Sequence, residues 1–306
     1  MFNIIGNRFR FFLISVVVIL IGIVSLASFG LKAGIEFSSG SLLTLRFDEE
    51  VEVVELKQEL DNLGHVNAIV QTTSGGDFLI RTFELTTSEK SQLENELTAR
   101  FGSLTEEGFV YISPETAIKT VQIATIAIAI AAIGIMLYVT WAFRRMPKPF
   151  RYGTCAIIAL LHDALVALGV FSILGGILGW EVNLMFITGI LAVIGYSVNN
   201  TVVIFDRIRE NLISGSSNNF ELVVNNSLVE SFTRSINTSL TTIIVVLALL
   251  LFVGSTIQNF SVVLLIGIIA GTFSSLFIAP SLLVVWEKGE WSRFMRWLPL
   301  VKFGSR

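Results

Sequence analysis

Two pairs of polar residues stand inside long apolar stretches of this sequence: His162 with Asp163, and Asn199 with Asn200. Polar side chains within a bilayer are costly unless they find partners, and they often mark the path of an ion or a substrate. A buried carboxylate such as Asp163 can bind and release a proton, whereas an amide only donates and accepts hydrogen bonds. These residues therefore indicate proton or ion movement inside a membrane.

His162 and Asp163 lie roughly ten residues into their apolar stretch, or about 15 Å along a helix axis. Because adjacent positions on a helix point in different directions, we expect these two side chains not to act as a simple pair. Two alternatives remain open for each residue: a part in transport, or a buried hydrogen bond between helices.

A cluster of charges follows the two amides. It consists of Asp206, Arg207, Arg209 and Glu210, at the point where the apolar stretch ends. We expect these side chains to form a solvated ion network where the helix meets water.

Long apolar runs are the elements that must position these residues. Hydrophobic residues make up 53% of the 306 residues, which is above the fraction of ordinary soluble domains. Runs of 18 or more apolar residues are long enough to cross a bilayer. The first run is longer than the apolar part of a signal peptide, so we expect an uncleaved span. The predicted membrane-spanning helices are six: 11–29, 118–141, 153–178, 183–205, 236–254 and 260–286.

Charge is distributed unevenly along the chain. Residues 30–115 contain 16 of the 24 acidic residues but only six of the 21 lysines and arginines, a net charge of −10. Basic residues gather near the N-terminus, in 144–151, around 206–210 and in 288–306. Six spans place these four clusters on one side, which the positive-inside rule assigns to the cytoplasm. Both termini are then cytoplasmic, and the acidic segment is external, or periplasmic.

The acidic segment has the pattern of a small α+β domain. Alternating apolar residues predict strands, and a helical spacing of apolar residues predicts two helices. The order β-α-β-β-α-β is the ferredoxin-like pattern. The predicted strands are Leu42–Phe47, Val66–Thr72, Phe78–Phe83 and Gly108–Ile112; the helices are Val51–Leu63 and one capped by Thr87 or Ser88 that ends near Phe101.

The fold class is therefore a polytopic α-helical membrane protein with an external α+β domain between its first two spans. Within the segment 206–234, Ser214–Asn219 breaks the helix. Phe220–Phe232 then forms either an interfacial amphipathic helix or a helix packed beneath the spans. The predicted division is 1–29 (first span), 30–115 (external domain), 116–286 (spans two to six) and 287–306 (cytoplasmic basic tail).

Several glycines stand where close helix packing needs them. Gly267 and Gly271 are four residues apart in the last span, and Gly189 and Gly195 lie in the fourth. We expect all four to permit close helix approach. The single cysteine, Cys155, is expected to be a small apolar packing residue.

Four motifs together resemble the SecF family. Gly34–Gly40 (GIEFSSG) is similar to the family's GIDFTGG, and Leu161–Asp163 to its intramembrane HD pair. Gly195–Asn211, beginning with Gly195 and Tyr196, resembles GYSINDTIVVFDRIREN. Thr233–Thr242 (TRSINTSLTT) resembles the family's SRT-x-x-TSLTT pattern. Because the order and spacing also match, the resemblance covers nearly the whole chain.

The resemblance implies a fold and a function. It implies a six-span half of the kind found in the RND superfamily, in the bacterial inner membrane. The implied partners are SecD, the SecYEG channel and a translocating polypeptide, with the proton-motive force driving late export. No cofactor, metal, catalytic residue or nucleic acid is expected, and the sequence contains no G-x-x-x-x-G-K-[ST] motif.

The chain departs from the family's pattern at Asn200. The motif has a proton-carrying Asp at this position, and Asn resembles the protonated form of Asp without being able to release a proton. Three explanations remain open: an engineered substitution, proton coupling that rests on the partner SecD, and coupling to another ion or to none. Asn199 is expected to form hydrogen bonds between helices. Arg234, matched to the family's conserved Arg, is either a fixed cation in the relay or an interfacial anchor.

Two other function classes remain as alternatives. One is a self-contained RND-like transporter of small solutes or lipids, and the other is a non-transporting membrane scaffold or chaperone. An enzyme is disfavoured because no nucleophile–base arrangement and no metal-ligand spacing stands out.

Overall fold

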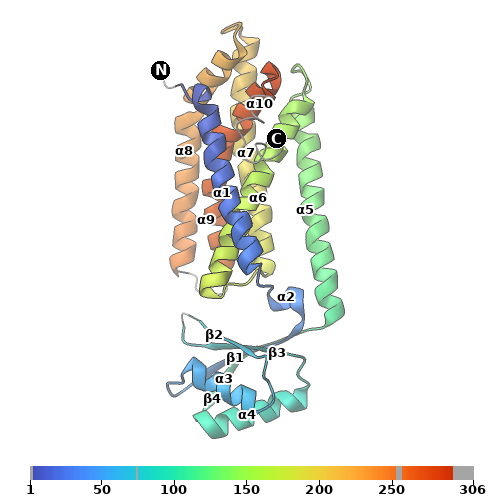
Figure 1. Cartoon of the computed structure of the whole chain (residues 1–306), viewed down its shortest axis with the longest axis vertical. Helices are drawn as coiled ribbons and strands as arrows, with labels where there is room; N and C mark the ends of the chain where they lie inside the picture. Colours follow the sequence, from blue (N-terminus) through green and yellow to red (C-terminus); the bar gives the residue numbers. More distant parts are fainter. Residues whose placement is uncertain (1–2, 74, 253–256, 292–306) are drawn as a thin grey trace, which may run out of the picture.

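The computed structural model describes residues 3–73, 75–252 and 257–291, and it consists of a long helical bundle with a small α+β domain at one end (Figure 1). Six helical segments of the described chain are long and apolar enough to cross a membrane, which confirms the six predicted spans. Helices suit this environment because they satisfy their own backbone hydrogen bonds. The bundle helices are α1 (Arg8–Phe29), α5 (Pro114–Ala142), α6 (Phe150–Leu178), α7 (Leu184–Ile213), α8 (Phe220–Phe252), α9 (Gln258–Phe273) and α10 (Ala279–Lys288).

Two short segments complete the helices of the bundle. A 3₁₀ turn, Ile5–Asn7, precedes α1, and a π-helical turn, Ser274–Ile278, joins α9 to α10 within the last span. The sequence analysis did not predict the π-helical turn. The predicted tail, 287–306, lies mostly outside the described residues.

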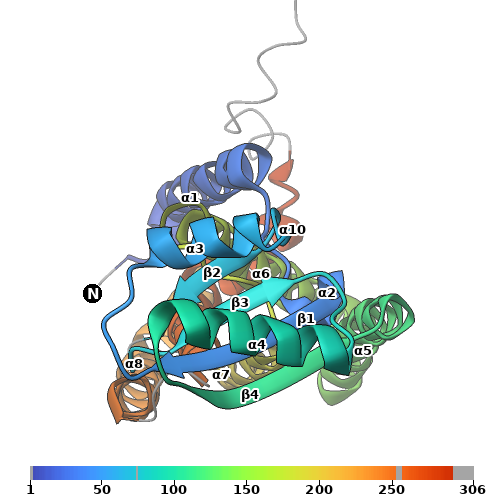
Figure 2. The ribbon, with the colours of Figure 1, turned by 90° about the horizontal axis from the view of Figure 1, so that it is seen from below.

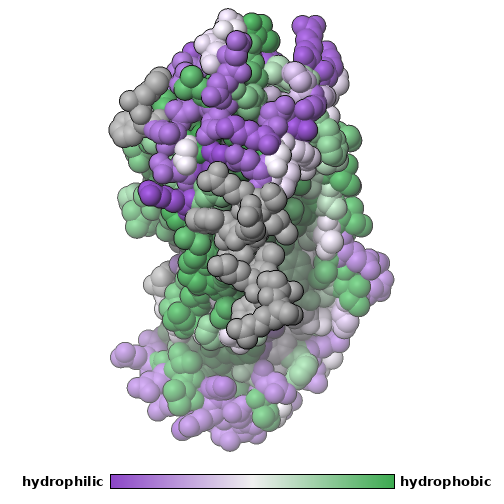
Figure 3. Space-filling model, turned by 45° about the horizontal axis from the view of Figure 1, so that its top comes forward, coloured by the Kyte–Doolittle hydropathy of each residue, from purple (hydrophilic) through white to green (hydrophobic). Residues whose placement is uncertain are grey.

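The centre of the bundle is formed by α6, α7 and α9. In the most apolar stretch of the last span, 61% of the residues are buried, whereas in that of α5 only 6% are buried. Figure 1 shows α5 at the edge of the bundle, with its lower part diverging from the other helices toward the α+β domain. Hydrophilic residues gather at the opposite end of the bundle (Figure 3).

Small residues let the central helices approach closely. A Cβ atom on Gly189 would lie 2.9 Å from the Val263 side chain, and one on Gly267 would overlap Val193. The prediction of close approach is confirmed for these two glycines and for Gly271. At Gly195 the space within the described chain is open, so close approach there stays a prediction for a partner helix.

The α+β domain has the predicted order of elements. Its strands form one antiparallel sheet in the order β2-β3-β1-β4, as the ferredoxin-like pattern requires. Figure 2 shows both helices on the same face of this sheet, away from the bundle. The elements are β1 (Gly40–Phe47), α3 (Val53–Asn62), β2 (Ile69–Thr72), β3 (Phe78–Thr82), α4 (Thr87–Phe101) and β4 (Leu104–Ile112).

Two local features of this domain differ from expectation. The residue that caps α4 is Thr86, in a capping box with Glu89, and not Thr87 or Ser88. A short helix, α2 (Ile35–Ser38), precedes β1. The residue that follows this helix, Ser39, has a φ of 62°, which lies in the region that favours glycine. The GIDFTGG motif has a glycine at this position.

The predicted boundary between the helix Phe220–Phe232 and the fifth span is wrong, whereas the packing of this segment against the bundle, one of the two alternatives, is confirmed. These residues form the first part of α8, which runs without interruption to Phe252. No glycine or proline lies between 220 and 252, so nothing in the sequence stops the helix. Val224 and Leu228 are fully buried, which places this part of α8 against the bundle.

The packing of α1 on α6 gives a test of the fold. A Cβ atom on Gly169 would lie 2.6 Å from the Cα atom of Gly22, so Gly169→Ala should lower the free energy of unfolding by about 1–3 kcal/mol. Gly134→Ala is the matched control, because it adds the same methyl group to open space on α5. Thermal unfolding of the purified chain measures both variants, and equal stability of the two would contradict this packing.

Candidate functional site

Asp163 is the centre of a buried polar cluster within the bundle. Its side chain is 1% exposed. Its Oδ2 atom accepts hydrogen bonds from the Ser197 hydroxyl at 2.6 Å and the Ser274 hydroxyl at 2.9 Å. Its Oδ1 atom lies 2.9 Å from Nδ1 of His162. Helices α6 and α7 and the π-helical turn thus each contribute to satisfying one buried carboxyl group.

The expectation that His162 and Asp163 do not act as a pair is therefore wrong. Neighbouring positions on a helix do point in different directions, but the rotamers of two adjacent side chains can bring their polar atoms together across that angle. The His162 ring is held by stacking on Phe273, with ring centroids 6.2 Å apart. The two side chains therefore form a hydrogen-bonded pair.

Local features of the last span make room for this cluster. A Cβ atom on Gly271 would lie 3.4 Å from Oδ2 of Asp163 and 3.0 Å from Cβ of Ser197. The π-helical turn that follows brings two consecutive hydroxyls to α6 and α7, because Ser274 bonds to Asp163 and Ser275 lies 2.8 Å from the Thr201 hydroxyl. Such single π-helical turns occur frequently at functional sites.

Asn200 belongs to a second buried cluster, whose hub is Ser239 of α8. The Asn200 amide donates to the Ser239 hydroxyl at 3.4 Å, and the Tyr196 hydroxyl donates to the same atom at 3.0 Å. Ser239 also lies 2.6 Å from the Thr272 hydroxyl. The side chain at the expected proton-carrying position is thus inside the bundle, among hydroxyl groups and without a charge.

Asn199 faces the other way. Its side chain is exposed on the surface of α7, on the same stripe as Thr188, Ala192 and Gly195. Among the residues that the structure describes, the predicted hydrogen bonds between helices are not formed by Asn199. A stripe of small and polar residues on a membrane helix is typical of a surface that another helix covers.

Arg234 is exposed on α8 and does not lie at the level of Asn200. Ser239, which contacts Asn200, is five residues further along the helix, or about 7.5 Å along its axis. Arg234 instead lines a hollow of about 240 Å³ with Arg207, Glu210 and Glu230.

The charged cluster after α7's apolar part forms the predicted interfacial ion network. Arg207 pairs with Glu210 at 2.8 Å and with Glu230 of α8 at 2.7 Å. Arg209 pairs with Asp206 at 2.6 Å. All these side chains are partly exposed, so the network joins two helix ends without enclosing a site.

Sequence reasoning did not predict the roles of the serines and threonines in the two clusters. Ser197 and Ser239 lie within the matched motifs, but small hydroxyl residues in membrane helices commonly pack without a role in chemistry. The signal that could have found them is their position on the helix faces that also carry Asp163 and Asn200. Among the described residues, no group of three or more His, Cys, Asp or Glu side chains is arranged to hold a metal ion.

Comparison with known proteins supports the resemblance. The family described as "Protein export membrane protein SecD/SecF, C-terminal" matches residues 92–289, which include α5 to α10, and the family described as "SecD/SecF GG Motif" matches residues 24–51. The chain belongs to the SecD/SecF family. The second match contains Gly34–Gly40, and the first contains both polar clusters.

Relatives of two kinds occur within the SecD/SecF family. The chain is 40% identical to "Protein translocase subunit SecF" of Thermobaculum terrenum and 41% identical to that of Anaerolinea thermophila, over 97% of both chains in each case. It is 34% identical to "Protein translocase subunit SecDF" of Bacillus subtilis, of which it covers 38%. The crystal structure of SecDF from Thermus thermophilus, described as a translocon-associated membrane protein, superposes with a TM-score of 0.83 at 29% identity; the match covers 94% of this chain and 39% of that one.

The buried carboxyl group gives a direct test of the site. Asp163→Ala leaves the hydroxyls of Ser197 and Ser274 without their acceptor, so we expect the free energy of unfolding to fall by about 2–4 kcal/mol. Asp206→Ala removes a half-exposed carboxylate and should cost less than about 1 kcal/mol. Thermal unfolding in detergent compares the two, and similar losses would show that the Asp163 cluster is not a satisfied buried network.

Proposed function

We propose that this chain is the SecF subunit of a bacterial protein-export machinery. It acts with SecD and the SecYEG channel in the inner membrane, and the pair uses the proton-motive force to drive late translocation of a polypeptide. The observation that carries the proposal is the similarity to translocase subunits along almost the full length of both chains. Its role is in transport, without a covalent reaction on the substrate.

The partnership with SecD is supported by the relatives named SecDF, in which the counterpart of this chain is little more than a third of one longer protein. The surface of α7 and α8 supports it too. Asn199, Asn237 and Thr241 are all exposed on membrane helices, where lipid satisfies polar groups poorly. A partner helix that covers this surface would give these polar side chains hydrogen-bond partners and so remove the free-energy cost of exposing them to lipid.

The relay that we propose is divided between the two subunits. Asn200 cannot release a proton, so the proton-carrying group facing this surface belongs to SecD, with Arg234 as a fixed cation that favours its ionised form. Asn200 and Ser239 contribute hydrogen bonds that do not titrate. Asp163, paired with His162, is the buried carboxyl group that this chain itself supplies. An engineered origin of Asn200 and coupling to another ion remain alternatives.

The proposed orientation places the end of the bundle opposite the α+β domain in the cytoplasm. Basic side chains meet at that end: Arg8 pairs with Glu221 at 2.8 Å and with Glu290 at 2.6 Å, and Lys148 pairs with Glu287. The acidic domain is then external, in agreement with the positive-inside rule. In that position it meets the polypeptide as it leaves the channel.

Asn200→Asp tests the assignment of position 200. A carboxyl group there restores the residue that the family motif has, so export by membrane vesicles that contain the full complex should depend more strongly on the proton gradient. Asn199→Asp adds the same charge one residue away, on the exposed surface, and should produce no such gain. Export and pH response that stay unchanged in Asn200→Asp would remove position 200 from the relay.

Arg234→Ala tests the fixed cation. We expect export to fall about tenfold while the protein still inserts and assembles, because the charge acts on the relay rather than on the fold. Arg144→Ala is the control, since Arg144 contacts Trp141 at the helix end and faces no relay group in the proposal. Normal export by Arg234→Ala would make this residue an interfacial anchor.

A further inference from the structure

The two oxygens of the Asp163 carboxyl group are closed to protons from water. Oδ2 accepts hydrogen bonds from the Ser197 and Ser274 hydroxyls, and a carboxylate oxygen has two lone pairs to offer, so Oδ2 is fully used. Oδ1 faces Nδ1 of His162 at 2.9 Å. Because the Asp163 side chain is only 1% exposed, water does not reach the lone pair that remains on Oδ1. A proton therefore reaches this carboxyl group through a neighbouring side chain.

The His162 ring is the open side of the pair. Its Nδ1 atom is engaged by Oδ1 of Asp163, whereas its Nε2 atom forms no hydrogen bond with any residue that the structure describes. The His162 side chain is 8% exposed, more than that of Asp163, and stacking on Phe273 fixes the plane of the ring. Nε2 is thus the atom at which the pair can gain or lose a proton.

The other titratable groups of the helices packed on α6 do not contact the pair. Residues 258–278 of the last span contain none. On α7, the Tyr196 hydroxyl donates to Ser239 and not to Asp163. The remaining groups stand in the first or last two turns of their helices: Arg8 and Arg10 on α1, Glu115, Lys119 and Tyr138 on α5, Arg151, Tyr152 and Cys155 on α6, Asp206, Arg207, Arg209 and Glu210 on α7, Glu287 and Lys288 on α10.

We propose that His162 is the proton-exchange residue of this chain, with Nε2 as the atom that takes up and releases the proton. Asp163 is a positioning residue in this proposal: it holds Nδ1 on the inner side and leaves Nε2 open. The inference rests on the proposed function in one respect, because it assigns the path by which a proton reaches the buried carboxyl group that this chain supplies to the relay.

The proton can be followed atom by atom. An ionised carboxylate only accepts hydrogen bonds, so in the unloaded pair Nδ1 carries a hydrogen that it donates to Oδ1, and Nε2 carries none. A proton then binds to Nε2, and the hydrogen on Nδ1 moves along its hydrogen bond to Oδ1. The pair has gained one proton and lost its net negative charge, and release reverses the two steps.

The two serines decide which oxygen of Asp163 faces the ring. Both hydroxyls donate to Oδ2, so an acceptor atom must occupy that position. In Asp163→Asn the amide oxygen should therefore take the place of Oδ2, and the amide NH₂ group should face Nδ1. Nδ1 then has to accept a hydrogen bond, and the hydrogen of the neutral ring moves to Nε2.

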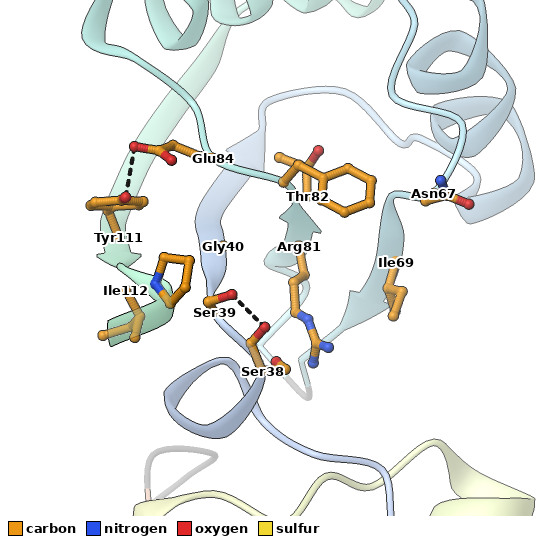
Figure 4. Close-up of a pocket in the computed structure, with 12 residues that line it drawn as sticks. Ser38, Ser39, Gly40, Asn67, Ile69, Arg81, Thr82, Glu84, Tyr111 and Ile112 are labelled. Atoms are coloured by element: carbon orange, nitrogen blue, oxygen red, sulfur yellow. Dashed lines mark hydrogen bonds between the residues drawn. The ribbon is translucent and has the colours of Figure 1, made fainter. Parts of the chain in front are cut away.

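The protonation of the two ring nitrogens tests this assignment directly. The chain contains two histidines. The other one, His65, lies in the α+β domain, where its Nδ1 atom is 3.3 Å from the hydroxyl of Thr82, a residue that lines the hollow in Figure 4. Labelling histidine with ¹⁵N in His65→Gln thus leaves the signals of the His162 ring alone. Solid-state NMR of the full chain in lipid bilayers distinguishes a nitrogen that carries hydrogen from one that does not.

The parent and its variants should give different patterns at about pH 9 and about pH 5, on either side of the range in which histidine side chains commonly titrate. In the parent, Nδ1 should carry the hydrogen in base, and Nε2 should become protonated in acid. Asp163→Asn should show a protonated Nε2 at both pH values. Asp206→Asn is the matched control, because it changes a half-exposed carboxylate at the end of α7, and it should behave as the parent does.

The positioning role of the serines has its own readout. Ser197→Ala and Ser274→Ala together remove both donors to Oδ2. When they are combined with Asp163→Asn, the amide is free to turn over, and part of the His162 signal in base should return to the form with hydrogen on Nδ1. A protein that is only less stable would not show this return.

Proton flux in vesicles that contain the full complex gives a second measurement. His162→Gln should lower the flux about tenfold or more, since an amide does not exchange protons, whereas His65→Gln should leave it unchanged. A parent spectrum with hydrogen on Nε2 in base, Asp163→Asn with hydrogen on Nδ1, or normal flux in His162→Gln would overturn the proposal. The NMR measurement needs neither a partner nor export. Loss of its pattern in a chain that supports export therefore contradicts this inference alone, and absence of export with the pattern intact contradicts the proposed function alone.

Discussion

The requirement that every polar group inside the apolar bundle must find a partner determines the architecture around Asp163. Lipid and packed apolar side chains provide no hydrogen bonds, so a carboxyl group that is 1% exposed needs donors from its own chain. Ser197 and Ser274 supply them from two other elements, and His162 supplies the third contact. The absence of a side chain at Gly271 and the π-helical turn after it bring the last span close enough for this to happen.

Much of this molecule could be predicted from sequence because the signals are long or local. Six apolar runs predicted the six spans, and alternating and helical patterns predicted the order of elements in the α+β domain. The hydrogen bonds that join different helices in the site could not be predicted, because each of them joins residues more than thirty positions apart. The contact between Asn200 and Ser239, for example, depends on α8 lying beside α7, which the sequence does not show.

Errors arose where a neighbouring helix or a rotamer outweighed a local rule. Phe220–Phe232 has the composition of an interfacial helix, yet it continues into α8 because no residue interrupts the helix. His162 and Asp163 were expected to diverge, and stacking on Phe273 instead holds the ring beside the carboxyl group. Gly195 does not pack within the bundle but faces open space with Asn199, which fits a surface that another subunit covers.

The two polar clusters differ in whether their side chains can ionise. The Asp163 cluster contains groups that titrate, whereas the Asn200 cluster contains amide and hydroxyl groups that do not. A relay through position 200 therefore needs a carboxyl group from another chain. Proton flux into proteoliposomes, measured for this chain alone and together with its SecD partner, tests this division most directly. The account predicts flux driven by a pH gradient only when the partner is present; the same flux with this chain alone would contradict it.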